Sequence, residues 1–311
     1  MSTPPVAPHR SRRVPAVRLN RRSQIVLGIV CIISVAVFGW PLIIAPTSAI
    51  AGHANVPLLF AALLPLVLAV AMTEIADGGL DAKAIAMLGV LTALGAALRP
   101  LGTGIAGIEP IFFLLVLAGR VFGPGFGFLL GCLTLLASAL VTGGVGPWLP
   151  YQMLAAAGVA IGAGLLPRAE GRREILMLAA YGAVAGIAYG LAMNLSFWPF
   201  TVGEASELSY IAGAPILDNL QRFAVFSVLT SLAFDIPRAL LMVVLIVITG
   251  PALLRTFRRA ARKAVFDATP TFVASDDATT TGSPRAPSPG AATIASSDKR
   301  ARPSSGADER G

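Results

Sequence analysis

Charged residues are scarce in this chain: Asp, Glu, Lys and Arg together make up 13% of its 311 residues. A soluble domain usually carries about 25% charged residues. Hydrophobic residues reach 55%, and the mean hydropathy is +0.76. The shortage of charge therefore excludes an ordinary soluble domain and predicts an all-α polytopic membrane protein.

Cysteine and histidine are nearly absent, with two of each. Cys31 and Cys132 both lie inside apolar runs, where cysteine serves as a small packing residue, so we expect no disulfide. His9 falls in the N-terminal arm and His53 in a loop. With so few ligating side chains, we expect no metal site and no cofactor.

Motifs of common enzyme classes are also missing. The sequence contains no Gly-x-x-x-x-Gly-Lys-Ser/Thr loop for ATP, no His-Glu-x-x-His and no Gly-x-Ser-x-Gly. No ionisable residue falls at the middle of a predicted span, where ion-coupled carriers usually place one. We therefore expect a protein that is not an enzyme.

Positive charge is present in excess, with a formal net charge of +8. The basic residues are confined to the N-terminal arm, short loops and the segment after the last apolar run. This distribution is a membrane-topology signal and does not form a nucleic-acid patch. We expect the lipid bilayer, and no nucleic acid, as a partner.

Eight apolar runs predict eight membrane spans. The fourth span follows Glu109-Pro110 and ends at Arg120; the others cover about 24–44, 56–73, 84–98, 128–142, 150–166, 175–195 and 236–255. A cleaved signal peptide is the alternative for the first run, because Ala49-Ile-Ala51 resembles a cleavage site. A run of ~20 residues exceeds the usual apolar region of a signal peptide and favours a retained span.

The last apolar region, 220–254, would be about 52 Å long as one helix, whereas the hydrocarbon core is about 30 Å thick. We expect it to divide at Asp235-Ile-Pro-Arg238, with Asp235 as N-cap and Pro237 in the first turn. The preceding piece, 220–234, would be a half-buried outer helix. The alternative is a single tilted helix kinked at Pro237.

An even number of spans places both termini on the same side, and all basic clusters lie in the cytoplasm when that side is the inside. We expect the chain in the plasma membrane. Counting 220–234 as a ninth span would put the C-terminal basic cluster outside. The predicted organisation is a basic cytoplasmic arm at 1–23, two N-terminal transmembrane helices within 24–81, a six-helix core at 82–256, and a cytoplasmic basic segment with a disordered tail at 257–311.

Small residues recur every four positions on three predicted spans: Gly89/Ala93/Ala97, Gly158/Gly162 and Gly182/Gly186/Gly190. Such spacing places them on one helix face, so that another helix can approach closely. Packing within the chain is one explanation. An external partner is the other, and the stripe nearest the cytoplasm is Ala82, Ala86 and Gly89.

Several polar and aromatic residues map to the predicted outer side. The stretch Gly143–Met153 contains Trp148, Tyr151 and Gln152, which suit a small organic ligand but also suit an interfacial turn. The other candidates are Arg99, Glu109, Asn194, Trp198, Asn219, Arg222, Asp235 and Arg238. The charges either pair structurally, Asp235 with Arg238 and Arg99 with Glu109, or line an outer ligand site.

The order of motifs resembles a known family. The motifs are Ala93-x-x-x-Ala-Leu-Arg99-Pro, Glu109-Pro-Ile-Phe, Gly119-Arg-Val-Phe-Gly-Pro-Gly-Phe-Gly, Gly143-Gly-Val-Gly-Pro-Trp-x-Pro-Tyr-Gln-Met, Gly162-Ala-Gly-Leu-Leu-Pro and Phe234-Asp-Ile-Pro-Arg-Ala. Together they resemble the substrate-binding S components of energy-coupling factor (ECF) transporters, nearest to a group often linked to cobalamin. The resemblance covers about residues 82–256.

The resemblance implies a membrane subunit that captures a vitamin or related micronutrient from outside. Its partners would be a T component, docked on Ala82, Ala86, Gly89 and Ala93, and two cytoplasmic ATPase subunits. Arg99, Glu109, Trp148, Tyr151, Gln152, Asn194, Trp198, Asp235 and Arg238 would form or border the substrate site. The two extra N-terminal spans and the long tail depart from the family pattern. A stand-alone carrier or channel, and a non-transporting membrane scaffold, are the alternative functions.

Overall fold

The computed structural model describes residues 21–43, 56–77, 80, 82–102, 107–201 and 208–266. Every regular element in these ranges is helical, and the chain is an all-α polytopic membrane protein. Most of the predicted basic arm at 1–23 and nearly all of the tail predicted to be disordered lie outside the described residues.

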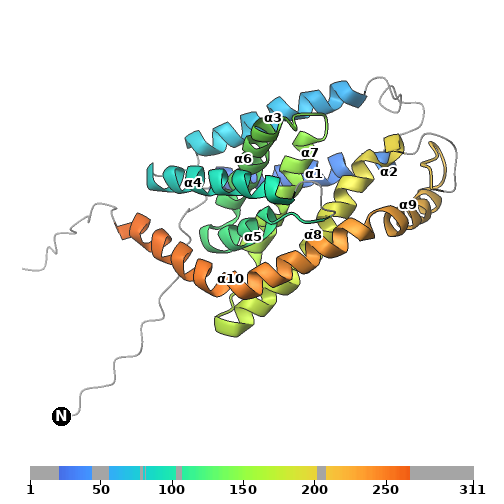
Figure 1. Cartoon of the computed structure of the whole chain (residues 1–311). Helices are drawn as coiled ribbons and strands as arrows, with labels where there is room; N and C mark the ends of the chain where they lie inside the picture. The colour runs from blue at the N-terminus through green and yellow to red at the C-terminus, as the bar shows by residue number, and fades with distance from the viewer. Residues whose placement is uncertain are drawn as a thin grey trace, which may run out of the picture. The chain divides into compact units, whose positions relative to one another are not determined.

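The helices follow the predicted spans in order (Figure 1). They are α1 (Arg21–Phe38), α2 (Trp40–Ile43), α3 (Val56–Asp77), α4 (Ala82–Leu98) with the 3-10 turn η2 (Arg99–Gly102), α5 (Ile111–Phe122), α6 (Pro124–Thr142), α7 (Leu149–Leu165), α8 (Gly171–Thr201), α9 (Ile216–Thr230) and α10 (Leu232–Phe266). Five of them are long and apolar enough to cross a membrane, and 63–73, α5 and α7 are shorter apolar stretches.

Helix α5 is the buried centre of the bundle. It packs against α6, α7, α8 and α10, and side chains such as Leu115 and Val116 are fully buried. Its 12 residues rise only about 18 Å, less than the hydrocarbon thickness, but its neighbours shield it from lipid. Gly123, at φ 95°, ends α5, and Pro124 begins α6 directly afterwards.

The two longest helices, α8 and α10, lie side by side (Figure 1). Their contact is made through the glycine stripe of α8. A Cβ on Gly182 would lie 2.9 Å from Ile246 Cδ1, and one on Gly186 would lie 3.2 Å from Met242 Sδ. This stripe therefore serves packing within the chain.

Helix α4 uses only one of its faces for packing. Leu88 and Leu91 are buried, and Gly95 lies against Thr134 of α6. The small residues of the opposite face, Ala82, Ala86, Gly89 and Ala93, are all exposed. A Cβ added to Gly89 would meet no atom within 4 Å.

The N-terminal spans attach to the core through α6, α7 and α8. Helix α3 packs on α6 and α7, and α1 packs on α6, α7 and α8. Trp40, in α2, donates from its indole nitrogen to the Ser196 carbonyl oxygen of α8 at 3.0 Å. Phe38 lies edge-on to Tyr151 of α7, with ring centroids 5.7 Å apart.

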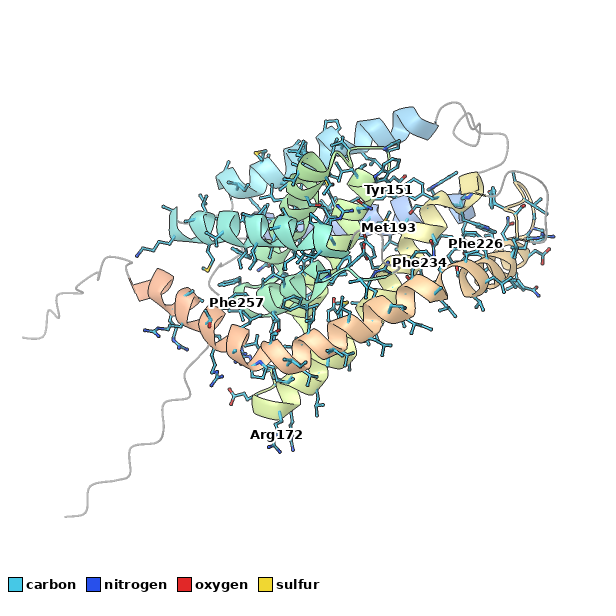
Figure 2. The ribbon with its side chains drawn as sticks, in the orientation of Figure 1. Tyr151, Arg172, Met193, Phe226, Phe234 and Phe257 are labelled. Atoms are coloured by element: carbon cyan, nitrogen blue, oxygen red, sulfur yellow. The ribbon has the colours of Figure 1, made fainter. Side chains whose placement is uncertain are left out.

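The last apolar region is divided, as its length predicted, but at a different residue. Helix α9 ends at Thr230 and α10 begins at Leu232 rather than at Ile236. Asp235 therefore lies in the first turn of α10 and is not its N-cap, and Pro237 lies within the helix. Figure 2 shows Phe234 near the start of α10 and Phe257 near its other end.

Helix α8 also runs further than predicted, to Thr201 instead of 195. Its extension is stabilised by α9, because Trp198 is fully buried against Phe223 and Phe226. The Trp198 indole nitrogen donates to the Leu208 carbonyl oxygen at 2.7 Å. Hydropathy alone ended the span where polar residues began and missed this contact.

Candidate functional site

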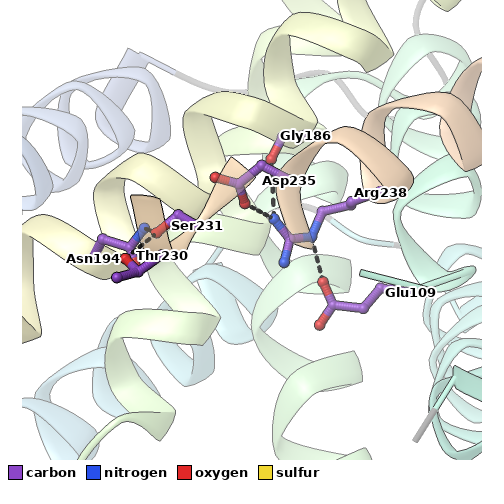
Figure 3. A network of polar contacts seen from close by, with 7 residues as sticks. All are labelled: Glu109, Gly186, Asn194, Thr230, Ser231, Asp235 and Arg238. Carbon is purple, nitrogen blue, oxygen red and sulfur yellow. Dashed lines mark hydrogen bonds and ion pairs between the residues drawn. The ribbon is translucent and has the colours of Figure 1, made fainter. Parts of the chain in front are cut away.

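A buried ion-pair cluster lies where α10 begins (Figure 3). Arg238 donates from Nε to Glu109 Oε2 at 2.5 Å and from Nη1 to Asp235 Oδ1 at 2.5 Å. The same Nη1 donates to the Gly186 carbonyl oxygen at 3.3 Å. The predicted local pair of Asp235 and Arg238 is therefore present, and Arg238 rather than Arg99 is the partner of Glu109.

Gly190 makes room for this cluster. A Cβ there would lie 1.8 Å from Asp235 Oδ1, so only glycine lets α8 approach the carboxylate. Asp235 is 2% exposed, and its second oxygen, Oδ2, accepts no hydrogen bond from a described residue. The α8 glycine stripe thus positions a charged group as well as packing two helices.

A second polar group lies where α4 ends. Arg99 donates from Nη1 to Ser138 Oγ of α6 and from Nη2 to Gln152 Oε1 of α7, both at 2.9 Å. Ser138 is fully buried and fixes the guanidinium from one side. Arg99 is thus held between α6 and α7 by neutral groups.

Tyr189 of α8 connects the two groups. The Arg238 guanidinium lies over its ring, 5.2 Å from the centroid, and Phe112 packs against it at 4.5 Å. Tyr189 also interacts electrostatically with Arg99 and Glu109. The structure therefore gathers these charges at one end of the bundle. We call it the Arg99 end and define it by Arg99, Glu109, Asp235 and Arg238.

The predicted aromatic residues fall into different surroundings. Trp148 is 45% exposed, and its indole nitrogen donates to the Gly144 carbonyl oxygen of the α6–α7 turn at 3.2 Å. Tyr151 is buried against Met193 and Phe197 (Figure 2). Trp198 is enclosed by α9, so of these three only Trp148 presents an open ring face.

Asn194 lies one turn beyond Gly190 on α8. Its side-chain nitrogen donates to Ser231 Oγ, between α9 and α10, and Thr230 Oγ1 lies 3.4 Å from the same hydroxyl (Figure 3). Asn219 is buried and exchanges hydrogen bonds with the Ile211 backbone. Asn194 and Asn219 thus hold α9 and its preceding loop in place.

A second ion-pair cluster lies at the other end of the bundle and was not predicted. Glu174 Oε1 accepts from Arg120 Nε at 2.9 Å and from Arg258 Nη2 at 2.5 Å. Arg120 also donates to the Leu166 carbonyl oxygen at 2.8 Å. This cluster, the Glu174 end, joins α5, α8 and α10. Glu174 falls on the buried face of α8 with Leu178, Gly182 and Ala185, and that periodicity is the signal that could have identified it.

The two clusters are spaced like the borders of a bilayer. From Arg238 to Arg258, α10 rises roughly 30 Å at about 1.5 Å per residue. This matches a hydrocarbon core of about 30 Å. The final turns of α8 and all of α9 then lie beyond the border at the Arg99 end. Burial against Trp198 raises the pKa of Tyr210, which lies in this outlying part.

The described residues contain no group of three or more His, Cys, Asp or Glu that could hold a metal ion. The chemistry that the Arg99 end offers is instead hydrogen bonding and charge: guanidinium and carboxylate groups, an amide and one open indole face. No family model, no curated protein and no solved structure matches the chain. Similarity to known proteins therefore assigns it no function.

Replacing Gly190 with alanine is expected to displace the Asp235 carboxylate and break its contact with Arg238. Overpacking of this kind costs about 1–3 kcal/mol. The matched control is Gly158→Ala on α7, where an added Cβ meets nothing within 4 Å. Thermal unfolding in detergent should show a lower midpoint for Gly190→Ala and none of this loss for Gly158→Ala. Equal midpoints would contradict the close approach of α8 to Asp235.

Proposed function

We propose that the chain is the substrate-binding membrane subunit of an ECF-type importer, and that it captures a vitamin-like micronutrient from the outer face. The observation that carries the proposal is the convergence of Arg99, Glu109, Gln152 and Arg238 at one end of the bundle. These side chains come from segments far apart in the sequence, and the exposed ring of Trp148 lies on the turn that leads into α7. Small-molecule sites combine such aromatic surface with a few fixed polar groups.

The distribution of basic residues favours an orientation with the Arg99 end outside. Arg168, Arg172 and Arg173 precede or begin α8 beside Glu174, and Arg255, Arg259 and Arg262 follow on the same end of α10. Lys and Arg near the ends of spans favour the cytoplasm. The Arg99 end would then face the outside, and both termini would be cytoplasmic at the plasma membrane.

Energy for uptake would have to come from partners, since the sequence has no ATP-binding loop. We assign this role to a T component with two cytoplasmic ATPase subunits. The exposed small-residue face of α4, with Ala82, Ala86, Gly89 and Ala93, is available for the T component. A scaffold would use such a face too, and ligand binding is what distinguishes it from an importer subunit.

The test is to purify the chain in detergent, denature it, and identify any released small molecule by absorbance and mass spectrometry. We expect a corrinoid or another vitamin at a near-equimolar amount, and its loss when both Trp148→Ala and Gln152→Ala are introduced. Gly158→Ala is the control that should keep the molecule. A chain that is empty and binds no vitamin from a panel would move the assignment to a carrier or a scaffold.

A second arm separates the importer subunit from a stand-alone carrier. Uptake of the identified molecule is measured in cells whose partner ATPase carries an inactivating substitution in its own ATP-binding loop. An energised importer loses uptake in those cells. Uptake that continues unchanged would favour the carrier.

A further inference from the structure

We propose that Arg99 binds an anionic group of the substrate, a carboxylate or a phosphate; this inference rests on the proposed function and names the substrate class of the same site. The inference follows from four observations. They are the lack of an ion pair between Arg99 and any described residue, the charge balance of the Arg99 end, the hydrogen-bond donors that the described contacts leave unused, and the way in which the guanidinium is held. Each of these observations concerns contacts among the described residues.

The first observation is that no described carboxylate pairs with Arg99. Its two hydrogen bonds go to the neutral side chains of Ser138 and Gln152. It makes no ion pair with any described residue, whereas Arg120, Arg238 and Arg258 each contact a carboxylate. A charge at the border of the hydrocarbon core costs a few kcal/mol unless it is paired or hydrated.

The second observation is that the two carboxylates described at the Arg99 end already bind another arginine. Glu109 and Asp235 both bind Arg238, so that cluster carries one negative charge in excess. Tyr189 contacts Arg238 and interacts electrostatically with Arg99 and Glu109. Among the described residues, the Arg99 end thus contains one guanidinium without an ion pair, together with two carboxylates that are both bound to Arg238.

The third observation concerns donors. A guanidinium carries five N–H groups, and a side-chain amide carries two. Hydrogen bonds to described residues use Nη1 and Nη2 of Arg99 once each, and on the Gln152 side chain they use Oε1 alone. Free N–H groups of Arg99 and the Gln152 amide therefore remain beside each other, and both can donate to the oxygens of one anion.

The fourth observation is that the guanidinium is fixed before any ligand arrives. Ser138 is fully buried on α6, and Gln152 lies in the first turn of α7. Holding Arg99 between two helices lowers the entropy lost when an anion binds. A charge-assisted pair of this kind is the stronger class of hydrogen bond.

A phospholipid headgroup carries the same chemistry as a substrate phosphate, so the experiment has to distinguish the two sources. The wild-type chain is placed in nanodiscs of phosphatidylcholine alone, which has no net charge. Binding is measured by calorimetry with matched pairs that differ in one anionic group: biotin and biotinamide, pantothenate and pantothenol, and thiamine monophosphate and thiamine. A parallel set of nanodiscs contains phosphatidylglycerol.

The decisive variant is Gln152→Glu. The Gln152 Oε1 atom already accepts from Arg99 at 2.9 Å, so a carboxylate of the same size supplies the missing counter-charge without new space. We expect this variant to unfold no more easily than the wild type. It should bind the anionic member of a pair at least about tenfold more weakly, because the added carboxylate occupies the guanidinium and repels the anion. Arg99→Gln should show the same loss, and Arg99→Lys should retain part of the binding. Arg259→Gln, an exposed change on α10, is the control that should bind as the wild type does.

Each outcome decides the inference. It is supported when wild type prefers the anionic member of a pair and Gln152→Glu removes that preference. Equal binding of both members, or unchanged binding in Gln152→Glu, overturns the inference while the proposed function stands. If no soluble anion binds and Arg99-dependent binding is seen with phosphatidylglycerol alone, Arg99 is assigned to lipid. That result overturns the inference as well. A chain that binds no panel member and releases no small molecule overturns the proposed function itself, and the inference with it.

Discussion

Arg238→Met is expected to cost the folded protein about 3–5 kcal/mol, because it leaves the buried Asp235 carboxylate and the partly exposed Glu109 carboxylate without a counter-charge. Methionine matches the length of the arginine stem, so the cavity is small and the loss reports mainly on charge. The measurement is reversible unfolding in mixed detergent micelles, followed by tryptophan fluorescence.

Neutralising the two carboxylates separates the effect of unpaired charge from that of lost packing. Adding Glu109→Gln and Asp235→Asn to Arg238→Met removes both unpaired charges, and the triple variant should regain much of the stability. Arg259→Met is the matched control, because Arg259 is exposed on the same helix. If Arg238→Met unfolds at the same detergent fraction as this control, the cluster contributes nothing to the fold.

The second large effect is expected at the opposite border. Replacing Glu174 with glutamine leaves Arg120 and Arg258 facing each other around one neutral amide. Because Arg258 is 24% exposed and can turn toward water, we expect a loss of about 3 kcal/mol, at the lower end for a broken buried pair. Unfolding in mixed micelles again provides the measurement.

Removing one of the two arginines tests the cause. Arg258→Met in the Glu174→Gln background relieves the repulsion and should recover part of the loss, whereas Arg173→Gln, an exposed neighbour of Glu174 on α8, should change little. A loss in the double variant equal to the sum of the losses in Glu174→Gln and Arg258→Met would mean that positions 174 and 258 do not interact.

The positions of the spans could be predicted because hydropathy records burial in lipid directly. Helices α4, α6 and α7 lie within a few residues of the ranges expected from composition. The breaks at Gly123 and Gly143 were marked by glycine and proline, whose backbone preferences are local. What the sequence could not provide was the partner of each charge.

Pairing across the bundle depends on helix rotation, which hydropathy does not measure. Asp235 and Arg238 are one helical turn apart, so their contact was predictable, whereas Glu109 pairs with a residue 129 positions away. Arg99 and Glu109 flank one loop, and their proximity in sequence suggested that they pair with each other. The rotation of α10 instead turns Arg238 toward Glu109. Trp198 was expected on the outer rim, and only the packing of α9 shows that it is enclosed.

The wide separation of Glu109 and Arg238 also sets a time order during synthesis. Ribosomes add about 5–20 residues per second, so the 129 positions between them take roughly 6–26 s to translate. Arg120 and Glu174 are 54 positions apart and can meet after roughly 3–11 s. Glu109 is therefore synthesised well before its partner exists, and during that interval water or the insertion machinery must solvate a carboxylate that the finished protein binds to Arg238 and leaves only partly exposed.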